Sequence, residues 1–126
     1  MTSANRCPCG TGLTFGECCE PFLRATAQAP TAERMMRSRY TAYAVQNRAY
    51  LLATWHPSTR PKSLVFDPAI EWLRLEILGR TGGGMLDSEG TVEFRATYRA
   101  DGVRQDQLEN SRFVRDGKTW FYVDDL

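Results

Sequence analysis

The sequence predicts an α+β fold in which helices come first and an antiparallel sheet follows. Three observations support this prediction. All four cysteines lie between residues 7 and 19, apolar side chains recur at helical spacing within residues 31–55, and apolar and polar residues alternate from residue 71 onward. Helices followed by strands are typical of α+β proteins, whereas a parallel sheet would need the two to alternate.

Size and charge bound the class of function. The chain has 126 residues, of which 42% are hydrophobic and 25% are charged, and its formal net charge is +1. This length suits one domain with a small appended module, and the charge gives no electrostatic reason to expect nucleic acid or a membrane as a partner. Residues 1–10 lack the apolar segment of a secretory signal, and no run is long enough to span a bilayer. We therefore expect a cytoplasmic protein.

The cysteines follow a spacing of Cys-x-Cys, eight residues and Cys-Cys. Cytoplasmic thiols stay reduced, so a tight cluster there is more often a metal site than a disulfide framework. A bond between the neighbours Cys18 and Cys19 would distort the intervening peptide, whereas four thiolates fit the tetrahedral coordination of zinc. The sequence predicts a structural Zn²⁺ held by Cys7, Cys9, Cys18 and Cys19. A redox pair and inert buried thiols are the alternatives.

Local signals around the cysteines agree with a metal knuckle. Pro8 and Gly10 fit a tight turn between the first two sulfurs, and the second pair is expected at the start of a helix within residues 15–25. Four thiolates carry more charge than one Zn²⁺ neutralises, and Arg6 and Arg24 are placed to offset the excess. Because sulfur would occupy every coordination position, the site is expected to be structural and not catalytic.

The predicted helices follow a polar linker. Thr31 is a favourable N-cap residue, and Glu33 lies in the first turn, where the helix dipole favours an anion. The apolar positions at helical spacing are Met36, Tyr40, Tyr43 and Ala44. A second helix is expected over residues 48–55, and His56-Pro57 should end it.

The second half of the chain predicts a meander of four strands. The expected strands cover residues 71–78, 91–100, 103–115 and 118–123. Asp101-Gly102 and Asp116-Gly117 are typical of two-residue hairpin turns. The glycine-rich residues 79–90 are expected to form a mobile loop.

The two turns also predict the register of the sheet. The expected pairs are Ala100 with Val103, Phe94 with Glu109, Val92 with Ser111, Arg115 with Lys118, Phe113 with Trp120, and Glu109 with Asp124. Cross-strand partners share a face, so Glu109 should point into a face rich in aromatic side chains. A buried carboxylate must be paired or must take up a proton through a raised pKa. Glu109 therefore either belongs to a functional pocket or makes a structural contact with Arg39 or His56, provided that no one-residue slip moves it to the other face.

Further residues are candidates for the same pocket. His56, the only histidine, is either a general base near Glu109 or a helix cap. Arg37 and Arg39 either form a solvated face, pair with strand carboxylates, or bind an anionic ligand. The complete candidate pocket comprises Arg39, Tyr43, Trp55, His56, Phe94, Glu109, Trp120 and Tyr122.

Several motifs resemble known families. CPCGTGLTFGECCEPF at residues 7–22 resembles the SEC-C motif, and RSRYTAY, YLLATWHP and SRFVRDGKTWFYVD resemble the YchJ family of bacterial proteins over nearly the whole chain. The resemblance implies a zinc-binding SEC-C module over residues 1–27. Over residues 28–126 it implies a nuclear-transport-factor-two-like domain, a cystatin-like roll with a curved sheet around helices. The SEC-C motif of the preprotein-translocase ATPase carries lysines where residues 13–17 read LTFGE, so its acidic chaperone partner is not implied.

Two classes of function agree with these features, and the sequence favours the first because it explains the closed metal site and the lack of a recognisable catalytic set. The first is a non-enzymatic adaptor in which the zinc module docks a protein partner. The second is a small-molecule-binding or catalytic pocket on the concave face of the sheet, although no nucleophile elbow, Walker loop or dinucleotide fingerprint occurs. An exposed apolar patch around Leu13 and Phe15 would favour docking, and a cavity of roughly a few hundred Å³ would favour the pocket.

Overall fold

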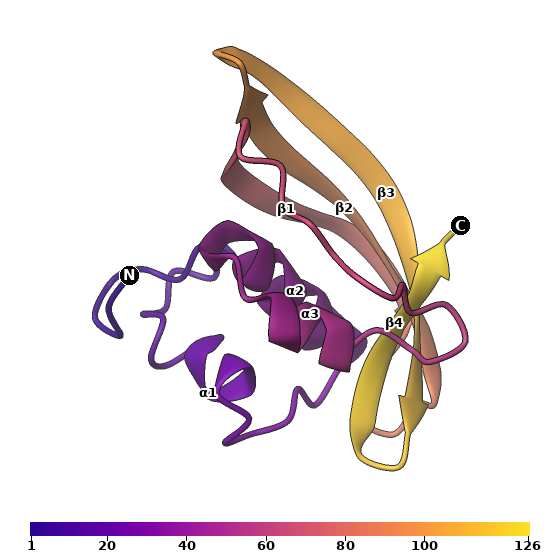
Figure 1. Cartoon of the computed structure of the whole chain (residues 1–126). Helices are drawn as coiled ribbons and strands as arrows, with labels where there is room; N and C mark the ends of the chain where they lie inside the picture. The colour runs from indigo at the N-terminus through magenta and orange to yellow at the C-terminus, as the bar shows by residue number, and fades with distance from the viewer.

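A four-stranded antiparallel sheet curves around the helices, and the cysteine-rich N-terminal segment lies on the far side of them (Figure 1). The computed structural model describes all 126 residues. The elements are α1 (Glu20–Leu23), α2 (Ala32–Val45), α3 (Arg48–Ala53), β1 (Ile70–Gly82), β2 (Glu89–Ala100), β3 (Val103–Asp116) and β4 (Thr119–Asp125). The strand order β1-β2-β3-β4 confirms the predicted α+β meander. None of the helices has the length and apolar character needed to cross a bilayer.

Helix α2 is the central element of the fold. It begins as predicted, because the Thr31 side chain accepts a hydrogen bond from the Arg34 backbone N–H at 3.1 Å. Helix α2 is buried over more of its surface than the single predicted stripe, because the N-terminal segment, α3 and the sheet all pack against it. Its buried residues are Ala32, Met35, Met36, Ser38, Arg39, Tyr40, Thr41 and Ala42.

The segment after α3 pairs with the last strand. Helix α3 is shorter than predicted and ends before Thr54. Trp55 forms a parallel bridge with Tyr122, and the His56 backbone N–H donates to the Tyr122 carbonyl at 2.7 Å. This pairing fixes Trp55 at one end of the concave face of the sheet.

The glycine-rich segment after β1 is more ordered than predicted. Strand β1 continues to Gly82 and β2 begins at Glu89, so only residues 83–88 form the connection. The Ala32 backbone N–H donates to the Gly83 carbonyl at 2.9 Å. A Cβ atom at Gly83 would lie 2.7 Å from the Ala32 Cβ, so the hairpin approaches the start of α2 as closely as it does only because glycine stands there.

One predicted hairpin register is confirmed and the other is wrong. The β2–β3 pairs are as predicted, with Phe94 opposite Glu109. In the β3–β4 hairpin the turn lies at Gly117 and Lys118, one residue later than expected. The observed pairs are Asp116 with Thr119, Arg115 with Trp120, Phe113 with Tyr122, Arg112 with Asp124, and Ser111 with Asp125.

A β-bulge between Arg112 and Phe113 accounts for the last two pairs. An extra residue in one strand reverses the faces beyond it. Asp125 therefore joins Ser111 on the concave face, and Asp124 pairs with Arg112 on the other face through a 3.0 Å contact. The expected pairing of Glu109 with Asp124 does not form.

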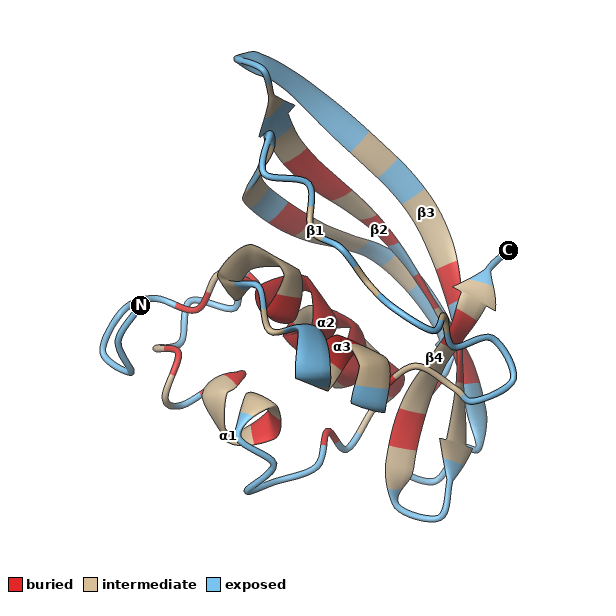
Figure 2. Cartoon of the chain, viewed as in Figure 1, coloured by how far each residue is buried: buried red, intermediate tan, exposed pale blue.

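The core runs without interruption from the cysteine-rich segment to the sheet (Figure 2). The same cluster of 17 buried residues holds the four cysteines, Phe15 and Phe22 on one side, and Val92, Phe94 and Trp120 on the other. Met35, Met36 and Tyr40 of α2 join the two sides. The cysteine-rich segment is thus part of the core of the whole protein.

Candidate metal centre and concave-face cavity

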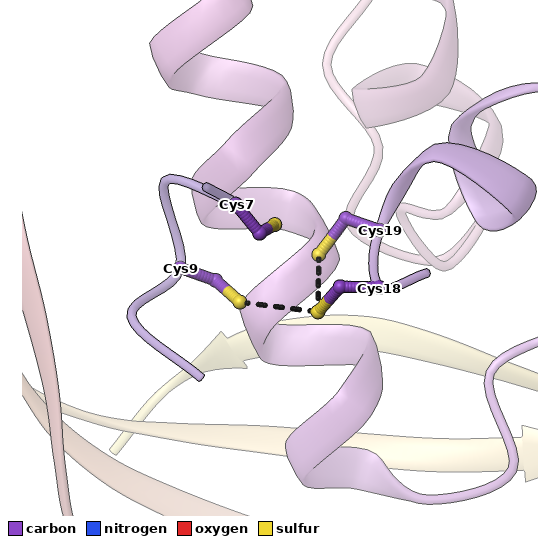
Figure 3. Close-up of side chains that lie close together, drawn as sticks. All are labelled: Cys7, Cys9, Cys18 and Cys19. Carbon is purple, nitrogen blue, oxygen red and sulfur yellow. Dashed lines mark hydrogen bonds between the residues drawn. The ribbon is translucent and has the colours of Figure 1, made fainter. Parts of the chain in front are cut away.

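The four cysteine side chains converge on one point (Figure 3). Their sulfur atoms all lie within 4.8 Å of one another, with 3.5 Å between Cys9 and Cys18 and 3.9 Å between Cys18 and Cys19. Metal–sulfur bonds of about 2.3 Å in a tetrahedron place the sulfurs roughly 3.8 Å apart. All four thiols are free and buried. The geometry is that of a four-cysteine metal site.

Short turns, and not regular elements, position these sulfurs. The Gly10 backbone N–H donates to the Cys7 carbonyl at 3.3 Å, and Gly10 has a φ of 85° that favours glycine. Cys19 occupies the N-cap of α1. The predicted helix over residues 15–25 is therefore wrong in extent, because α1 contains only Glu20–Leu23.

Helix α2 supplies the groups that surround the cysteines. The Arg37 Nη1 donates to the Cys9 carbonyl at 2.7 Å, and its Nε pairs with Glu33 at 3.1 Å. The Thr41 hydroxyl lies 3.6 Å from the Cys7 sulfur. The positive charge at the site therefore comes from Arg37. Of the arginines expected there, Arg24 instead pairs with Glu20 at 3.4 Å, and Arg6 is exposed.

Four buried thiols cannot all ionise without a cation. Hydrogen bonds from Cys19 and Cys7 lower the pKa of Cys9, which makes it the first thiolate. Burial raises the pKa of Cys18 to about 11, and the hydrogen bond to Cys7 raises the pKa of Cys19. A bound divalent cation would offset this cost by pairing with every sulfur. The donor set therefore fits a soft divalent metal.

A second candidate site lies between α2 and the concave face of the sheet. This cavity has a volume of about 290 Å³. It is lined by Met36, Arg39, Tyr40, Tyr43, Trp55, Trp72, Phe94, Ala96, Gln107, Glu109, Ser111, Tyr122 and Asp125. Six of the eight residues proposed from the sequence are in this lining, and the exceptions are His56 and Trp120.

The two exceptions have other surroundings. The His56 Nδ1 lies 2.7 Å from the Ser58 hydroxyl, and its ring packs edge-on against Phe121 with the centroids 5.9 Å apart. Phe121 and Tyr122 point to opposite faces of β4, which separates His56 from Glu109. Trp120 is fully buried, and its indole N–H donates to the Pro30 carbonyl at 3.2 Å. Trp120 is thus a core residue beside the start of α2.

Arg39 is buried at the cavity and does not form a solvated face. Its Nη1 donates to the Leu51 carbonyl at 2.8 Å and to the Thr54 hydroxyl at 2.7 Å. The guanidinium carbon lies 5.0 Å from the Trp55 ring centre and 4.7 Å from that of Tyr122. Burial lowers the pKa of Arg39 to about 10, so the group still carries its charge at neutral pH. Helix α3 and two aromatic rings therefore hold this cation in place.

Glu109 and Asp125 provide two carboxylates on the opposite wall. Glu109 is half-buried and accepts a hydrogen bond from the Gln107 amide. Asp125 accepts from the Ser111 hydroxyl at 2.9 Å and from the Tyr122 hydroxyl at 3.1 Å. Burial, together with the nearby charge of Asp125, raises the pKa of Glu109. Neither carboxylate belongs to any of the seven ion pairs of the protein, so the contact of Glu109 with Arg39 or His56 expected from the sequence does not form.

Several lining residues were not recognised from the sequence. Gln107 lies in a predicted strand and faces the cavity by simple alternation with Glu109, which is a usable signal. Trp72 shares the face of Leu75 only because the β1–β2 register shifts between Trp72 and Arg74, so alternation alone would place it on the opposite face. Asp125 faces the cavity only because of the β-bulge, and nothing in the local sequence marks that bulge.

This fold and the cysteine cluster define a class: a nuclear-transport-factor-two-like domain with an N-terminal SEC-C module. A family model described as "YchJ, middle NTF2-like domain" matches residues 31–125, and the SEC-C motif matches residues 5–21. The chain belongs to the YchJ family, which confirms the resemblance found in the sequence.

Relatives and solved structures support this assignment over nearly the whole chain. A UPF0225 protein from Corynebacterium glutamicum is 54% identical over 119 residues, covering 93% of this chain and 93% of the relative. One from Streptomyces avermitilis is 50% identical over 118 residues, covering 94% of this chain and 81% of the relative.

Two solved structures of SEC-C motif containing proteins share the fold. The solution structure of one from Rhodopseudomonas palustris is similar with a TM-score of 0.83 and 35% identity, covering 95% of this chain and 96% of that chain. The crystal structure of one from Psychrobacter arcticus has a TM-score of 0.79 and 25% identity, covering 97% of this chain and 82% of that chain.

Proposed function

We propose that the metal is Zn²⁺ and that it is structural. Four thiolates in a closed tetrahedral arrangement are the ligand set that zinc prefers, and they leave no coordination position for water or substrate. Arg37 orients the knuckle through the Cys9 carbonyl, as groups outside a metal's ligand shell usually do. In this role the ion stabilises the N-terminal segment against α2 and takes no part in chemistry.

We propose that the protein functions by binding a small molecule in the concave-face cavity. The observation that carries this proposal is the lining of the cavity, in which six aromatic rings surround one buried guanidinium and two carboxylates without an ion pair between them. Ligand sites in proteins combine apolar walls with a few convergent polar groups in this way. The polar groups are held by the fold before any ligand binds, which reduces the cost of binding.

A protein-docking role for the metal module has less support. It would be favoured by an apolar surface that includes both Leu13 and Phe15. Phe15 is instead buried in the core. Leu13, with 45% of its surface exposed, therefore forms no apolar patch with Phe15. A single exposed leucine is ordinary for a protein surface.

Native mass spectrometry tests both proposals on protein purified from its own host without chelator. We expect a mass increase of one zinc ion less the thiol protons that it replaces. A chain with four free thiols and no metal would contradict the zinc assignment, and a chain lighter by the hydrogens of two disulfides would establish the redox alternative. An additional adduct of low mass would identify the natural ligand class.

A fragment screen followed by amide chemical shifts tests the cavity without a natural ligand. Binding fragments should shift the signals of Tyr43, Trp72 and Ser111, which line the cavity. Ala96→Leu places a larger side chain in the cavity and should abolish these shifts. Ala53→Leu makes the same change at an exposed position of α3 and should preserve them. Shifts that cluster outside the lining, or that survive Ala96→Leu in a folded variant, would contradict the proposal.

A further inference from the structure

We infer that the cavity selects a small organic cation: a protonated amine on an apolar body, with its ammonium group between Glu109 and Asp125. This inference rests on the proposed function, since it names the ligand class of the same cavity. It assigns the carboxylates to ligand recognition and the aromatic rings to the walls around the apolar body.

The first argument is the charge balance inside the cavity. Its lining contains two carboxylates and only one basic side chain, Arg39. The hydrogen bonds of Arg39 go to α3 and not to either carboxylate. Its guanidinium lies close to the rings of Trp55 and Tyr122, which already offset part of its charge. A ligand therefore meets an excess of negative charge, which favours a cation and disfavours an anion.

The second argument is the arrangement of the two carboxylates. The Asp125 carboxylate is held by the hydroxyls of Ser111 and Tyr122, and Glu109 is held by Gln107. These neutral donors orient the carboxylates but supply no positive charge. Both carboxylates line the same cavity, and the charge of Asp125 adds to the cost of ionising Glu109. An ammonium group has several N–H donors and removes this repulsion by binding both oxygens.

The third argument is the aromatic wall. The Trp72 ring lies 5.9 Å from the Tyr40 ring and 6.1 Å from the Tyr43 ring, measured between centroids. Burial raises the pKa of Tyr40 to about 12 and also raises that of Tyr43, so both phenols are neutral at physiological pH. Neutral aromatic faces attract organic ammonium groups and cover apolar carbons. A cavity of about 150 Å³ holds benzene, so this one suits a ligand of roughly a dozen heavy atoms.

Isothermal titration calorimetry of the full zinc-loaded chain with three probes of similar size tests the inference. The probes are phenethylamine, which is cationic, phenethyl alcohol, which is neutral, and phenylacetate, which is anionic. Charge-assisted hydrogen bonds are stronger than neutral ones by an amount that corresponds to roughly ten- to a hundredfold in affinity. We expect the amine to bind tighter than the alcohol by this factor and phenylacetate to bind weakest.

Two variants assign the preference to the carboxylates. Glu109→Gln and Asp125→Asn keep the shape of the cavity, and each should weaken phenethylamine by about tenfold while leaving phenethyl alcohol unchanged. Glu93→Gln removes a carboxylate from an exposed position of β2 and is the matched control. Retained zinc and a cooperative thermal unfolding transition show that a variant is folded.

The outcomes separate this inference from the proposed function. Equal affinity for amine and alcohol, or tighter binding of phenylacetate, would overturn the cation preference and leave the cavity as a ligand site. The same conclusion follows if none of the three probes binds while other fragments shift the cavity residues. If neither the probes nor any fragment binds in the cavity, both the inference and the proposed function are wrong.

Discussion

The metal centre and the cavity lie against different faces of α2, and their polar groups are arranged in opposite ways. At the metal centre four sulfurs face one another, are buried, and leave no room for an outside molecule. At the cavity two carboxylates and a guanidinium surround an open volume of about 290 Å³ without pairing. A closed set of ligands contributes to stability, whereas polar groups held apart around a cavity contribute to recognition. The comparison predicts that substitutions of the cysteines affect mainly folding, whereas substitutions of the two cavity carboxylates affect mainly binding.

The largest effect is expected from Cys7→Ser or Cys18→Ser. A structural zinc contributes about 10–16 kcal/mol in small modules, and loss of one of four ligands should remove most of the metal and several kcal/mol of stability. Metal analysis should find the zinc content sharply reduced. Hydrogen exchange should show residues 1–25 unprotected while the β2–β3 hairpin keeps its amide protection. A variant with full zinc content would refute the four-thiolate site.

Removal of Arg39 should have the next largest effect on stability. It also tests whether the cavity and the metal centre are independent. Arg39→Met leaves the Leu51 carbonyl and the Thr54 hydroxyl without their buried donor. We expect a loss of about 2–4 kcal/mol in urea unfolding, because buried groups without a partner are costly. The zinc content should not change. Arg39→Lys keeps the charge but loses the planar fork, so it should recover only part of the stability. Loss of zinc from a folded Arg39→Met protein would show that the sites are not separate.

Arg37→Gln should affect the metal centre in a graded way. It removes the donor to the Cys9 carbonyl and the ion pair with Glu33. Groups outside the ligand shell of a metal typically change its affinity by about 10- to 100-fold, and a contact with a ligand's carbonyl belongs at the lower end. Competition with a chelator should therefore show zinc bound about tenfold more weakly. Arg48→Gln changes an exposed arginine on α3 and should leave zinc affinity unchanged.

The smallest effect is expected from Glu109→Gln, and it depends on pH. Because the pKa of Glu109 is raised in the folded state, its ionisation opposes folding, and this cost appears as the pH rises through the folded pKa. The variant should be more stable than the original protein at neutral pH, by about 0.5 kcal/mol or less, since the group is half-exposed and screened. The difference should vanish below about pH 4, where glutamate is protonated in both states.

Urea unfolding at several pH values measures this difference, with Glu93→Gln as control. The charged and polar groups that line the cavity with Glu109 are Arg39, Tyr40, Tyr43, Gln107, Ser111, Tyr122 and Asp125, together with the indole of Trp55 and that of Trp72. A loss of several kcal/mol in Glu109→Gln would mean that the carboxylate has a buried cationic partner, which would contradict the charge balance described for the cavity.

Local signals in the sequence predicted local structure well. Thr31 caps α2, the Asp101-Gly102 turn sets the β2–β3 register, and the cysteine spacing identifies a cluster that the structure brings together. In each of these cases the interacting groups are close in sequence or joined by one short turn. The elements therefore form with the geometry that their residue types favour.

Features that depend on distant contacts were not predicted. Arg39 is a pocket candidate in the sequence, but its hydrogen bond to α3 and its packing against Tyr122 of β4 depend on segments far from it in the chain. The contact of the β1–β2 hairpin with Ala32 explains glycines that otherwise indicate a loop. The register shift that brings Asp125 to the cavity lies between the Arg112 and Phe113 pairs of the β3–β4 ladder, where no turn residue marks it in the sequence. The sequence therefore identifies Glu109 as a cavity carboxylate, whereas Asp125 can be identified only from the register of the sheet.

The position of Arg37 and Arg39 two residues apart on one helix has a consequence for how the sites respond to each other. One arginine binds the metal knuckle and the other contacts the cavity, so a shift of α2 on ligand binding would move both. Thermodynamic linkage requires such coupling to be reciprocal: the factor by which metal strengthens ligand binding equals the factor by which ligand strengthens metal binding. Zinc affinity measured with and without phenethylamine therefore tests whether the two sites are coupled through α2.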